Sequence, residues 1–146
     1  MSLMFIDLDK FKPVNDNLGH HVGDLLLKDV ANRMLDCLRE SDSAARIGGD
    51  EFVVLLPYVE TEEDAVAVAE KIRHALNQPF ELLGNKIEIS CSIGVSVYPE
   101  HGNEERVLLR NADTAMYYAK ESGRNVVKLY TPEMKHMKKG PAGRSA

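Results

Sequence analysis

Cysteine is scarce in this sequence, and long apolar runs are absent. Its 146 residues include only Cys37 and Cys91, which are too few and too far apart for a disulfide framework or a zinc site. We expect both to be free thiols, as in a reducing compartment. No apolar run approaches the roughly 18 residues that cross a membrane, and no signal peptide is visible. We therefore expect a cytoplasmic domain. This expectation is compatible with a parent protein that is attached to a membrane.

Several catalytic motifs are absent as well. There is no Gly-x-x-x-x-Gly-Lys-Ser/Thr loop, no Gly-x-Ser-x-Gly elbow and no His-Glu-x-x-His pair, which argues against P-loop, α/β-hydrolase and zincin chemistry. The formal net charge of −5 argues against a nucleic-acid-binding surface over the whole domain. A local basic pocket for phosphates remains compatible with it. The hydrophobic content of 44% is typical of one globular domain with a core.

The most informative stretch is Arg46–Phe52, where Gly48 and Gly49 are followed directly by Asp50 and Glu51. Apolar residues on both sides predict two strands, and the glycines permit a tight turn between them. Paired carboxylates beside exposed backbone N–H groups suit a divalent metal that carries a phosphate ligand. A plain β-turn with solvated acids is the alternative.

The periodicity along the chain predicts an α+β fold. A turn-rich segment over residues 10–23 precedes a helix that Asp24 would cap. The order of elements matches a ferredoxin-like βαββαβ plan, with a central, mostly antiparallel sheet flanked by helices. We expect one domain over residues 4–131 and a linker or disordered tail over residues 132–146. The expected strands cover residues 3–8, 44–47, 52–56, 79–83, 86–89, 90–98 and 126–130, and the expected helices cover 25–38, 61–76 and 103–122.

Carboxylates and cations from separate elements are expected to meet in this fold. Asp7 ends the first strand, which lies beside the central hairpin in a ferredoxin-like core, so that Asp7 joins Asp50 and Glu51 in an oxygen-rich site suited to magnesium. A strand-end acid in solvent is the alternative for Asp7. Lys120 and Arg124 end the third helix, where they either complement the helix dipole or grip phosphates.

The segment before the first long helix offers further polar groups. Lys12 would add to the phosphate cradle. Asn15 and Asp24 together can satisfy the donors and the acceptor of a guanine edge, although Asp24 is also explained as the helix cap. His20 is explained by solvation, and a role in the site is the weaker interpretation.

Several spaced motifs together resemble the GGDEF domain family of diguanylate cyclases, which condense two GTP into cyclic di-GMP with release of pyrophosphate. The resemblance spans about residues 5–130 and implies a nucleotidyl-cyclase-like fold. The motifs are Phe5–Lys12, Asn15–Asp24, Arg46–Phe52, Ser92–Val95, Ala112–Lys120 and Gly123–Asn125.

The resemblance implies a role for each matching position. Asp50 would be the active-site acid and Glu51 the second essential carboxylate, with Mg²⁺ (or Mn²⁺) held by Asp7, Asp50 and the Leu8 carbonyl. The implied substrate contacts are Lys12, Asn15, His20, Asp24, Gly49, Lys120 and Arg124. Arg39 and Asp42, ahead of the two glycines, resemble the family's product-inhibition motif, which binds cyclic di-GMP; a polar helix end is the alternative.

The sequence thus predicts a product-inhibited diguanylate cyclase that binds GTP and works as a homodimer. The family's usual helix and Asp-x-Leu-Thr-Gly segment ahead of the first strand are missing, so we expect a truncated piece of a longer protein with sensor or EAL phosphodiesterase domains. The main alternative is a catalytically inactive module that binds GTP or cyclic di-GMP and regulates a neighbouring domain. An inert ferredoxin-like interaction domain would leave the motifs unexplained.

Overall fold

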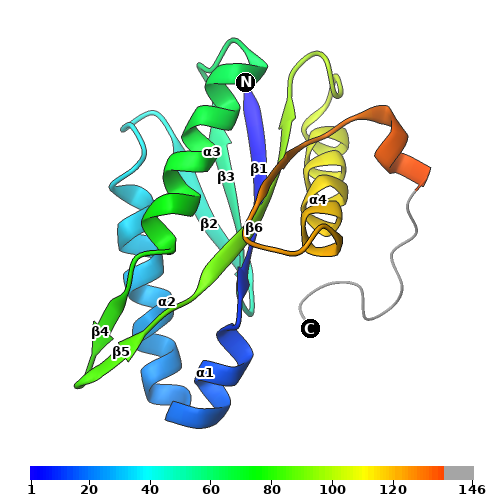
Figure 1. The fold of residues 1–146 in the computed structure, drawn as a ribbon. Helices are drawn as coiled ribbons and strands as arrows, with labels where there is room; N and C mark the ends of the chain where they lie inside the picture. Colours follow the sequence, from blue (N-terminus) through cyan, green and yellow to red (C-terminus); the bar gives the residue numbers. More distant parts are fainter. Residues whose placement is uncertain (137–146) are drawn as a thin grey trace.

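A computed structural model describes residues 1–136 of the chain. It contains a five-stranded sheet in the order β2-β3-β1-β6-β7 and a separate two-stranded hairpin, β4-β5 (Figure 1). The strands are β1 (Ser2–Asp9), β2 (Ser43–Gly48), β3 (Glu51–Leu56), β4 (Phe80–Leu82), β5 (Asn85–Ile87), β6 (Ser90–Val97) and β7 (Val127–Leu129). The helices are α1 (Phe11–Leu18), α2 (His20–Leu35), α3 (Glu62–Leu76), α4 (Glu105–Glu121) and the 3₁₀ helix η1 (Pro132–His136).

The sheet confirms the predicted fold class. β1 lies at its centre and pairs antiparallel with both β3 and β6, while β7 is added parallel to β6 at the edge. Without β7 the order is that of the βαββαβ plan, in which the first strand lies beside the second strand of the hairpin. The C-terminal end of β1 and the β2–β3 turn therefore lie at the same end of the sheet.

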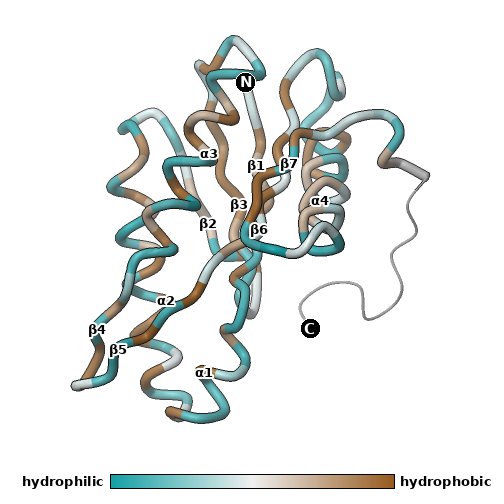
Figure 2. The backbone as a smooth tube through the Cα atoms, in the orientation of Figure 1, coloured by the Kyte–Doolittle hydropathy of each residue, from teal (hydrophilic) through white to brown (hydrophobic). Residues whose placement is uncertain are grey.

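Both faces of the sheet are covered by helices. Side chains alternate between the faces of a strand, and on β1 Met4 and Ile6 join the core with α2 and α3, whereas Phe5 packs with Ala112 and Met116 of α4. Figure 1 shows α2 and α3 on one side of the sheet and α4 on the other. In Figure 2 the hydrophobic colouring follows the central strands, and the helices alternate between hydrophilic and hydrophobic turns.

The segment over residues 10–23 is where the prediction was wrong. It forms α1 and the first turn of α2 instead of a loop, and Asp24 lies inside α2, not at its N-cap. Pro13 is compatible with α1 because it lies in the first turn, where a backbone N–H has no partner within the helix. Gly19, with φ +94°, separates the two helices.

Smaller differences concern turns and the C-terminal end. The turn between β4 and β5 consists of Leu83 and Gly84, both with positive φ, one residue earlier than predicted. Beyond β7, Met134 of η1 is buried against Ala115 and Tyr130. The boundary expected at residue 131 stays a prediction, and the expected tail falls from residue 137 onward outside the described residues. Within residues 1–136, no helix combines the length and the apolar character of a membrane span.

Gly94 of β6 lies close against the backbone of α4, and it yields a stability prediction. A Cβ at this position would lie 2.0 Å from the Ala112 carbonyl oxygen and 2.2 Å from the Met116 nitrogen. Since backbone atoms cannot move aside cheaply, Gly94→Ala should lower the free energy of unfolding by about 3 kcal/mol or more in urea denaturation. Gly84→Ala is the control, because no atom lies near its added Cβ and only its positive φ costs about 1 kcal/mol. Equal losses would contradict this packing.

Candidate functional site

The end of β1 and the β2–β3 turn bring three carboxylates together. Asp7 is opposite Glu51 in the β1–β3 register, and the Leu8 N–H donates to the Asp50 carbonyl over 3.1 Å. Asp7 is fully buried, and Asp50 and Glu51 are only 8% and 9% exposed. The acids therefore do not lie in solvent at a hairpin tip. They belong to the folded interior, which distinguishes them from an ordinary β-turn.

Lys120 supplies the positive charge that the buried Asp7 needs. It lies in the last turn of α4 with its ammonium Nζ 2.5 Å from Asp7 Oδ2, and both side chains are almost fully shielded from water. A buried charge is tolerated only when it is paired. The helix-dipole interpretation of Lys120 is therefore insufficient, because its side chain reaches into the carboxylate cluster.

Asp50 has an altered acidity. Burial raises the pKa of Asp50 to about 7, and the neighbouring Asp7 charge adds to this, while Lys120 opposes it. A carboxyl group with a pKa near neutrality can exchange a proton at physiological pH, which is the property expected of a general acid or base. The same rise shows that additional positive charge would be favourable beside these two acids.

A cleft of about 420 Å³ opens next to this cluster. It brings the predicted phosphate ligands Lys12, Lys120 and Arg124 together with Asp50 and Leu8. Lys10, Phe11 and Pro13 complete its lining. The cleft thus lies between α1 and the end of α4, and its lining combines lysine and arginine side chains with the carboxyl group of Asp50.

The other predicted substrate residues lie outside this lining. The Asn15 amide and the His20 ring are 2.9 Å apart, and the Asn15 side chain lies so close to Gly23 that it would collide with a Cβ there. Asp24 is exposed on the next turn of α2. Gly49 is fixed in the hairpin turn by its carbonyl, which accepts a bond from Arg46 Nε over 2.8 Å. The structure brings Asn15 and His20 together but places neither in the cleft.

The chemistry of the donors fits a hard divalent cation. The buried Asp7 carboxylate pairs with the Lys120 ammonium through Oδ2, and the Asp50 carboxyl group lies beside it. Residues 1–136 contain no group of three or more His, Cys, Asp or Glu side chains placed to enclose a metal. Two carboxylates with the Leu8 carbonyl would form an open site, and Mg²⁺ typically completes such a site with water and phosphate oxygens.

Arg39 and Asp42 lie at a separate cavity of about 300 Å³. They form one turn, because the Arg39 N–H donates to Asp42 Oδ2 over 2.8 Å and the Asp42 N–H donates to the Arg39 carbonyl over 3.0 Å. α2 ends at Leu35, so a helix end does not explain Arg39. Tyr58 and Asp64 also line this cavity, so that α3 forms part of its wall.

Sequence reasoning gave no role to Asp9, which is 1% exposed. Its carboxylate accepts hydrogen bonds from Ser90, Ser92 and the Asn125 N–H. The sequence feature that could have drawn attention to Asp9 is its spacing from Asp7, because residues two apart on a strand share a face. The partners of Asp9 are more than 80 positions away along the chain, which spacing alone does not reveal.

Comparison with known proteins gives consistent matches. Residues 1–126 match the family model described as diguanylate cyclase, GGDEF domain. The bifunctional diguanylate cyclase/cyclic di-GMP phosphodiesterase MucR of Pseudomonas aeruginosa is 48% identical over 85% of this chain, which covers 18% of MucR. The first curated relatives are all much longer, and the chain spans 18% to 30% of their length.

Solved structures agree with the sequence match. The crystallised GGDEF domain of PA1120 (YfiN or TpbB) from Pseudomonas aeruginosa is 43% identical with a TM-score of 0.86, over 89% of this chain and 81% of that one. The GGDEF domain of DgcB from Caulobacter crescentus, solved in complex with c-di-GMP, is 28% identical with a TM-score of 0.79, over 88% and 76% of the two chains.

The raised pKa of Asp50 predicts a pH-dependent stability. An unfolded Asp50 loses its proton near pH 3.8, whereas the folded one keeps it up to about pH 7. The contribution of Asp50 to the free energy of unfolding is therefore full below about pH 4 and falls as the pH rises through 7. Without divalent metal, the stability of Asp50→Asn relative to wild type should rise by up to about 4 kcal/mol between pH 4 and pH 8 in urea titrations.

Asp36→Asn is the matched control, because Asp36 is exposed at the end of α2. Asp36→Asn should not reproduce the rise expected for Asp50→Asn. A flat difference for Asp50→Asn would contradict the burial of a carboxylate pair.

Proposed function

The chain belongs to the GGDEF family of diguanylate cyclases, and from this premise we propose that it binds one GTP in the cleft and, as half of a homodimer, condenses two GTP into cyclic di-GMP. The observation that carries the proposal is the cleft itself, which brings the Asp50 carboxyl group together with the cations of Lys12, Lys120 and Arg124. Lys120 in turn pairs with the buried carboxylate of Asp7. The family generally depends on a divalent metal, and an oxygen-only donor set favours Mg²⁺, or Mn²⁺, here.

The cations would bind the triphosphate. Arg124 offers a planar fork that matches two phosphate oxygens, and Lys12 and Lys120 act as point charges. α1 begins at Phe11, so its first backbone N–H groups supply further donors beside the cleft. Held by these groups, the α-phosphate would face the open side of the cleft, where a second GTP has to approach.

The carboxylates would handle the metal and the proton. Asp7, Asp50 and the Leu8 carbonyl are the proposed metal ligands, and a bound Mg²⁺ would neutralise charge on the phosphates in the transition state. In each of two condensations, the 3′-oxygen of one GTP attacks the α-phosphorus of the other, and the bond to pyrophosphate breaks. Asp50 would take up the proton of the 3′-hydroxyl, and the buried Glu51 supports the same charge balance.

The base would be recognised beyond the cleft by Asn15, Asp24 and His20. The close contact of Asn15 with Gly23 and its bond to His20 would hold its amide beside α2, next to the exposed Asp24. An amide and a carboxylate together can satisfy the donors and the acceptor of guanine. Gly49 would allow the base or ribose to approach the hairpin backbone closely.

The reaction has consequences for the partners of the domain and for its place in a longer protein. One cleft holds one GTP, so a second copy must present the other, and a neighbouring domain that controls this encounter would control turnover. We place the catalytic domain at residues 4–131, within a longer protein with sensor or EAL domains, and acting in the cytoplasm, where GTP is available. Neither the substrate nor the charge of the chain calls for nucleic acid.

Cyclic di-GMP would bind back at Arg39 and Asp42. The cavity there presents a guanidinium and two carboxylates, from Asp42 and Asp64, which suit a phosphate and guanine edges respectively. This same cavity supports the second candidate function, a catalytically inactive module that binds GTP or cyclic di-GMP and regulates its neighbour. Turnover by the chain separates the two functions.

Asp50→Ala tests the catalytic proposal. Wild-type chain incubated with GTP and Mg²⁺ at a concentration where dimers are verified should release two pyrophosphates for each cyclic di-GMP, followed by chromatography. Asp50→Ala should lower the rate by on the order of 1,000-fold or more, because a metal ligand and the proton acceptor are both lost. Asp36→Ala, a matched change at an exposed position, should keep the wild-type rate. A verified dimer without product would favour the regulatory module instead.

Arg39→Ala tests product binding. In calorimetric titration with cyclic di-GMP, this variant should bind about tenfold more weakly or worse, because a charge-assisted hydrogen bond is lost. Arg106→Ala is the control, since the Arg106 side chain is 74% exposed and pairs only loosely with Glu104 at 3.6 Å. Equal affinity of wild type and Arg39→Ala would remove the inhibitory site from this cavity.

A further inference from the structure

We propose that Asp9 is a positioning residue that holds the loop after α4 so that Arg124 reaches the triphosphate. The proposal rests on the function proposed above and assigns a role to a carboxylate which that function does not use. Asp9 lies two residues beyond Asp7 on β1, but its partners differ. Asp7 faces Lys120, whereas Asp9 binds the loop that follows α4.

The Asp9 carboxylate is satisfied by directed hydrogen bonds. Oδ2 accepts from the Ser90 hydroxyl over 2.7 Å and from the Asn125 backbone N–H over 3.1 Å, and Oδ1 accepts from the Ser92 hydroxyl over 2.9 Å. The serine hydroxyls come from the neighbouring strand β6 and fix the orientation of the carboxylate. The third donor belongs to the loop, so a rigid group of the sheet determines where the loop lies.

This loop needs support because its backbone is strained. Gly123, Arg124 and Asn125 have φ values of +108°, +65° and +49°, and the left-handed conformation is unfavourable for an arginine. On one side the Arg124 N–H donates to the Ala119 carbonyl over 3.1 Å, which ties the loop to α4. On the other side the next residue, Asn125, is held by Asp9.

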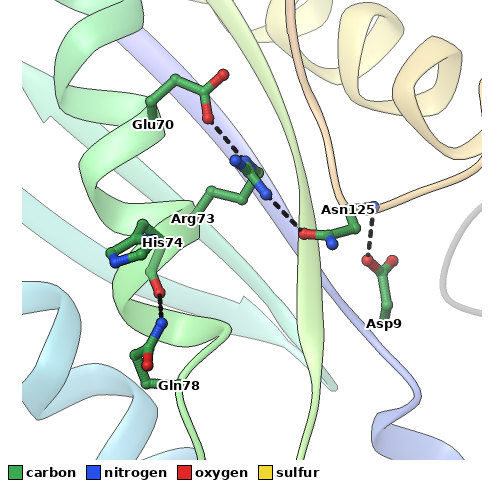
Figure 3. Close-up of polar contacts among 6 residues, drawn as sticks. All are labelled: Asp9, Glu70, Arg73, His74, Gln78 and Asn125. Carbon is green, nitrogen blue, oxygen red and sulfur yellow. Dashed lines mark hydrogen bonds and ion pairs between the residues drawn. The ribbon is translucent and has the colours of Figure 1, made fainter.

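A second contact fixes the Asn125 side chain (Figure 3). Its Oδ1 accepts from Arg73 of α3 over 2.9 Å, and Arg73 Nε in turn donates to Glu70 over 2.7 Å. Figure 3 shows the Arg73 guanidinium between the Glu70 carboxylate and the Asn125 amide, with Asp9 beside the Asn125 nitrogen. The loop is therefore held from β1 on one face of the sheet and from α3 on the other.

The Arg124 side chain itself remains available. Its guanidinium is 3.8 Å from Asp9 Oδ1, and the side chain is 49% exposed, so this ion pair is loose and a phosphate can replace it. Arg124 lines the cleft that contains Lys12 and Lys120. Asp9 thus fixes the backbone at Arg124 and leaves the Arg124 guanidinium free to bind a ligand.

The test measures binding, with a nucleotide that cannot react. 3′-Deoxy-GTP lacks the attacking hydroxyl, and its affinity in the presence of Mg²⁺ is compared with that of 3′-deoxyguanosine, which has no phosphate. Asp9→Asn should weaken binding of the triphosphate about tenfold and change binding of the nucleoside by less than about twofold. Equal losses for the two ligands would overturn the proposal, because general damage to the fold affects both.

A double-mutant cycle identifies Arg124 as the group through which Asp9 acts. In the Arg124→Ala background, Asp9→Asn should change triphosphate affinity by less than about twofold, since the residue it positions is already gone. The same tenfold loss in both backgrounds would overturn the proposal. Failure of the wild-type chain to bind 3′-deoxy-GTP would contradict the proposed function itself. Equal binding by wild type and Asp9→Asn would contradict only the role of Asp9.

Two buried serines of β6 provide a matched pair. Ser92 and Ser96 are both fully buried, but the Ser92 hydroxyl donates to Asp9 and the Ser96 hydroxyl donates to the Leu108 carbonyl over 2.6 Å. Ser92→Ala should weaken triphosphate binding in the same direction as Asp9→Asn, and Ser96→Ala should leave it unchanged, with both followed by thermal denaturation as well. Equal effects on binding would show that the loss of any buried hydroxyl in β6 suffices, and would overturn the specific role of Asp9.

Discussion

Negative charge buried at the end of β1 is the constraint on which the rest of the site depends. Asp7 and Asp9 share one face of the central strand and are at most 1% exposed. A carboxylate in such a place is unfavourable unless a cation or hydrogen-bond donors compensate it. The end of α4 provides both kinds of compensation, an ammonium from Lys120 for Asp7 and a backbone N–H from the following loop for Asp9. Charge balance in the core therefore fixes where α4 ends relative to the sheet.

The same balance prepares the cleft for chemistry. The β2–β3 hairpin adds Asp50 next to Asp7, which is electrostatically unfavourable in the folded chain and raises the pKa of Asp50 towards neutrality. A fold selected for stability alone would have little reason to bury a second acid there. A fold that binds a phosphate-carrying cation gains from it, because the ligand supplies the missing positive charge. The strain in the loop at Arg124 has the same explanation, since it directs a cation towards the cleft.

Much of the fold was predictable from the sequence, because continuous apolar runs mark β1 and β3, and helical periodicity marks α3 and α4. Thr61 caps α3 at the residue where that helix was expected to begin, since its hydroxyl accepts a hydrogen bond from the Asp64 N–H over 3.0 Å. The convergence of Asp7 with the hairpin also followed from the βαββαβ order. Residues 10–23 were misjudged because asparagine and proline favour turns locally, while the contacts of α1 with α2 decide in favour of a helix.

Contacts between distant side chains were out of reach of the sequence. Arg33 of α2 donates to the carbonyls of Ala75, Gln78 and Pro79 and lies 3.5 Å over the Phe80 ring. These contacts hold the end of α3, and no local sequence pattern predicts them. The burial of Asp50 and the partners of Asp9 were equally hidden, because both depend on how β1, β6 and α4 come together. Periodicity assigns a face to a residue but not its partner across the fold.

The central claim, that the acids of β1 and the hairpin and the cations of α4 form one site for a metal-bound triphosphate, is tested most directly by a crystal structure with 3′-deoxy-GTP and Mn²⁺, whose anomalous scattering locates the ion. We expect the ion between Asp7 and Asp50 and the phosphates between Lys12, Lys120 and Arg124. A triphosphate bound elsewhere, or an ion away from Asp7 and Asp50, would contradict the account.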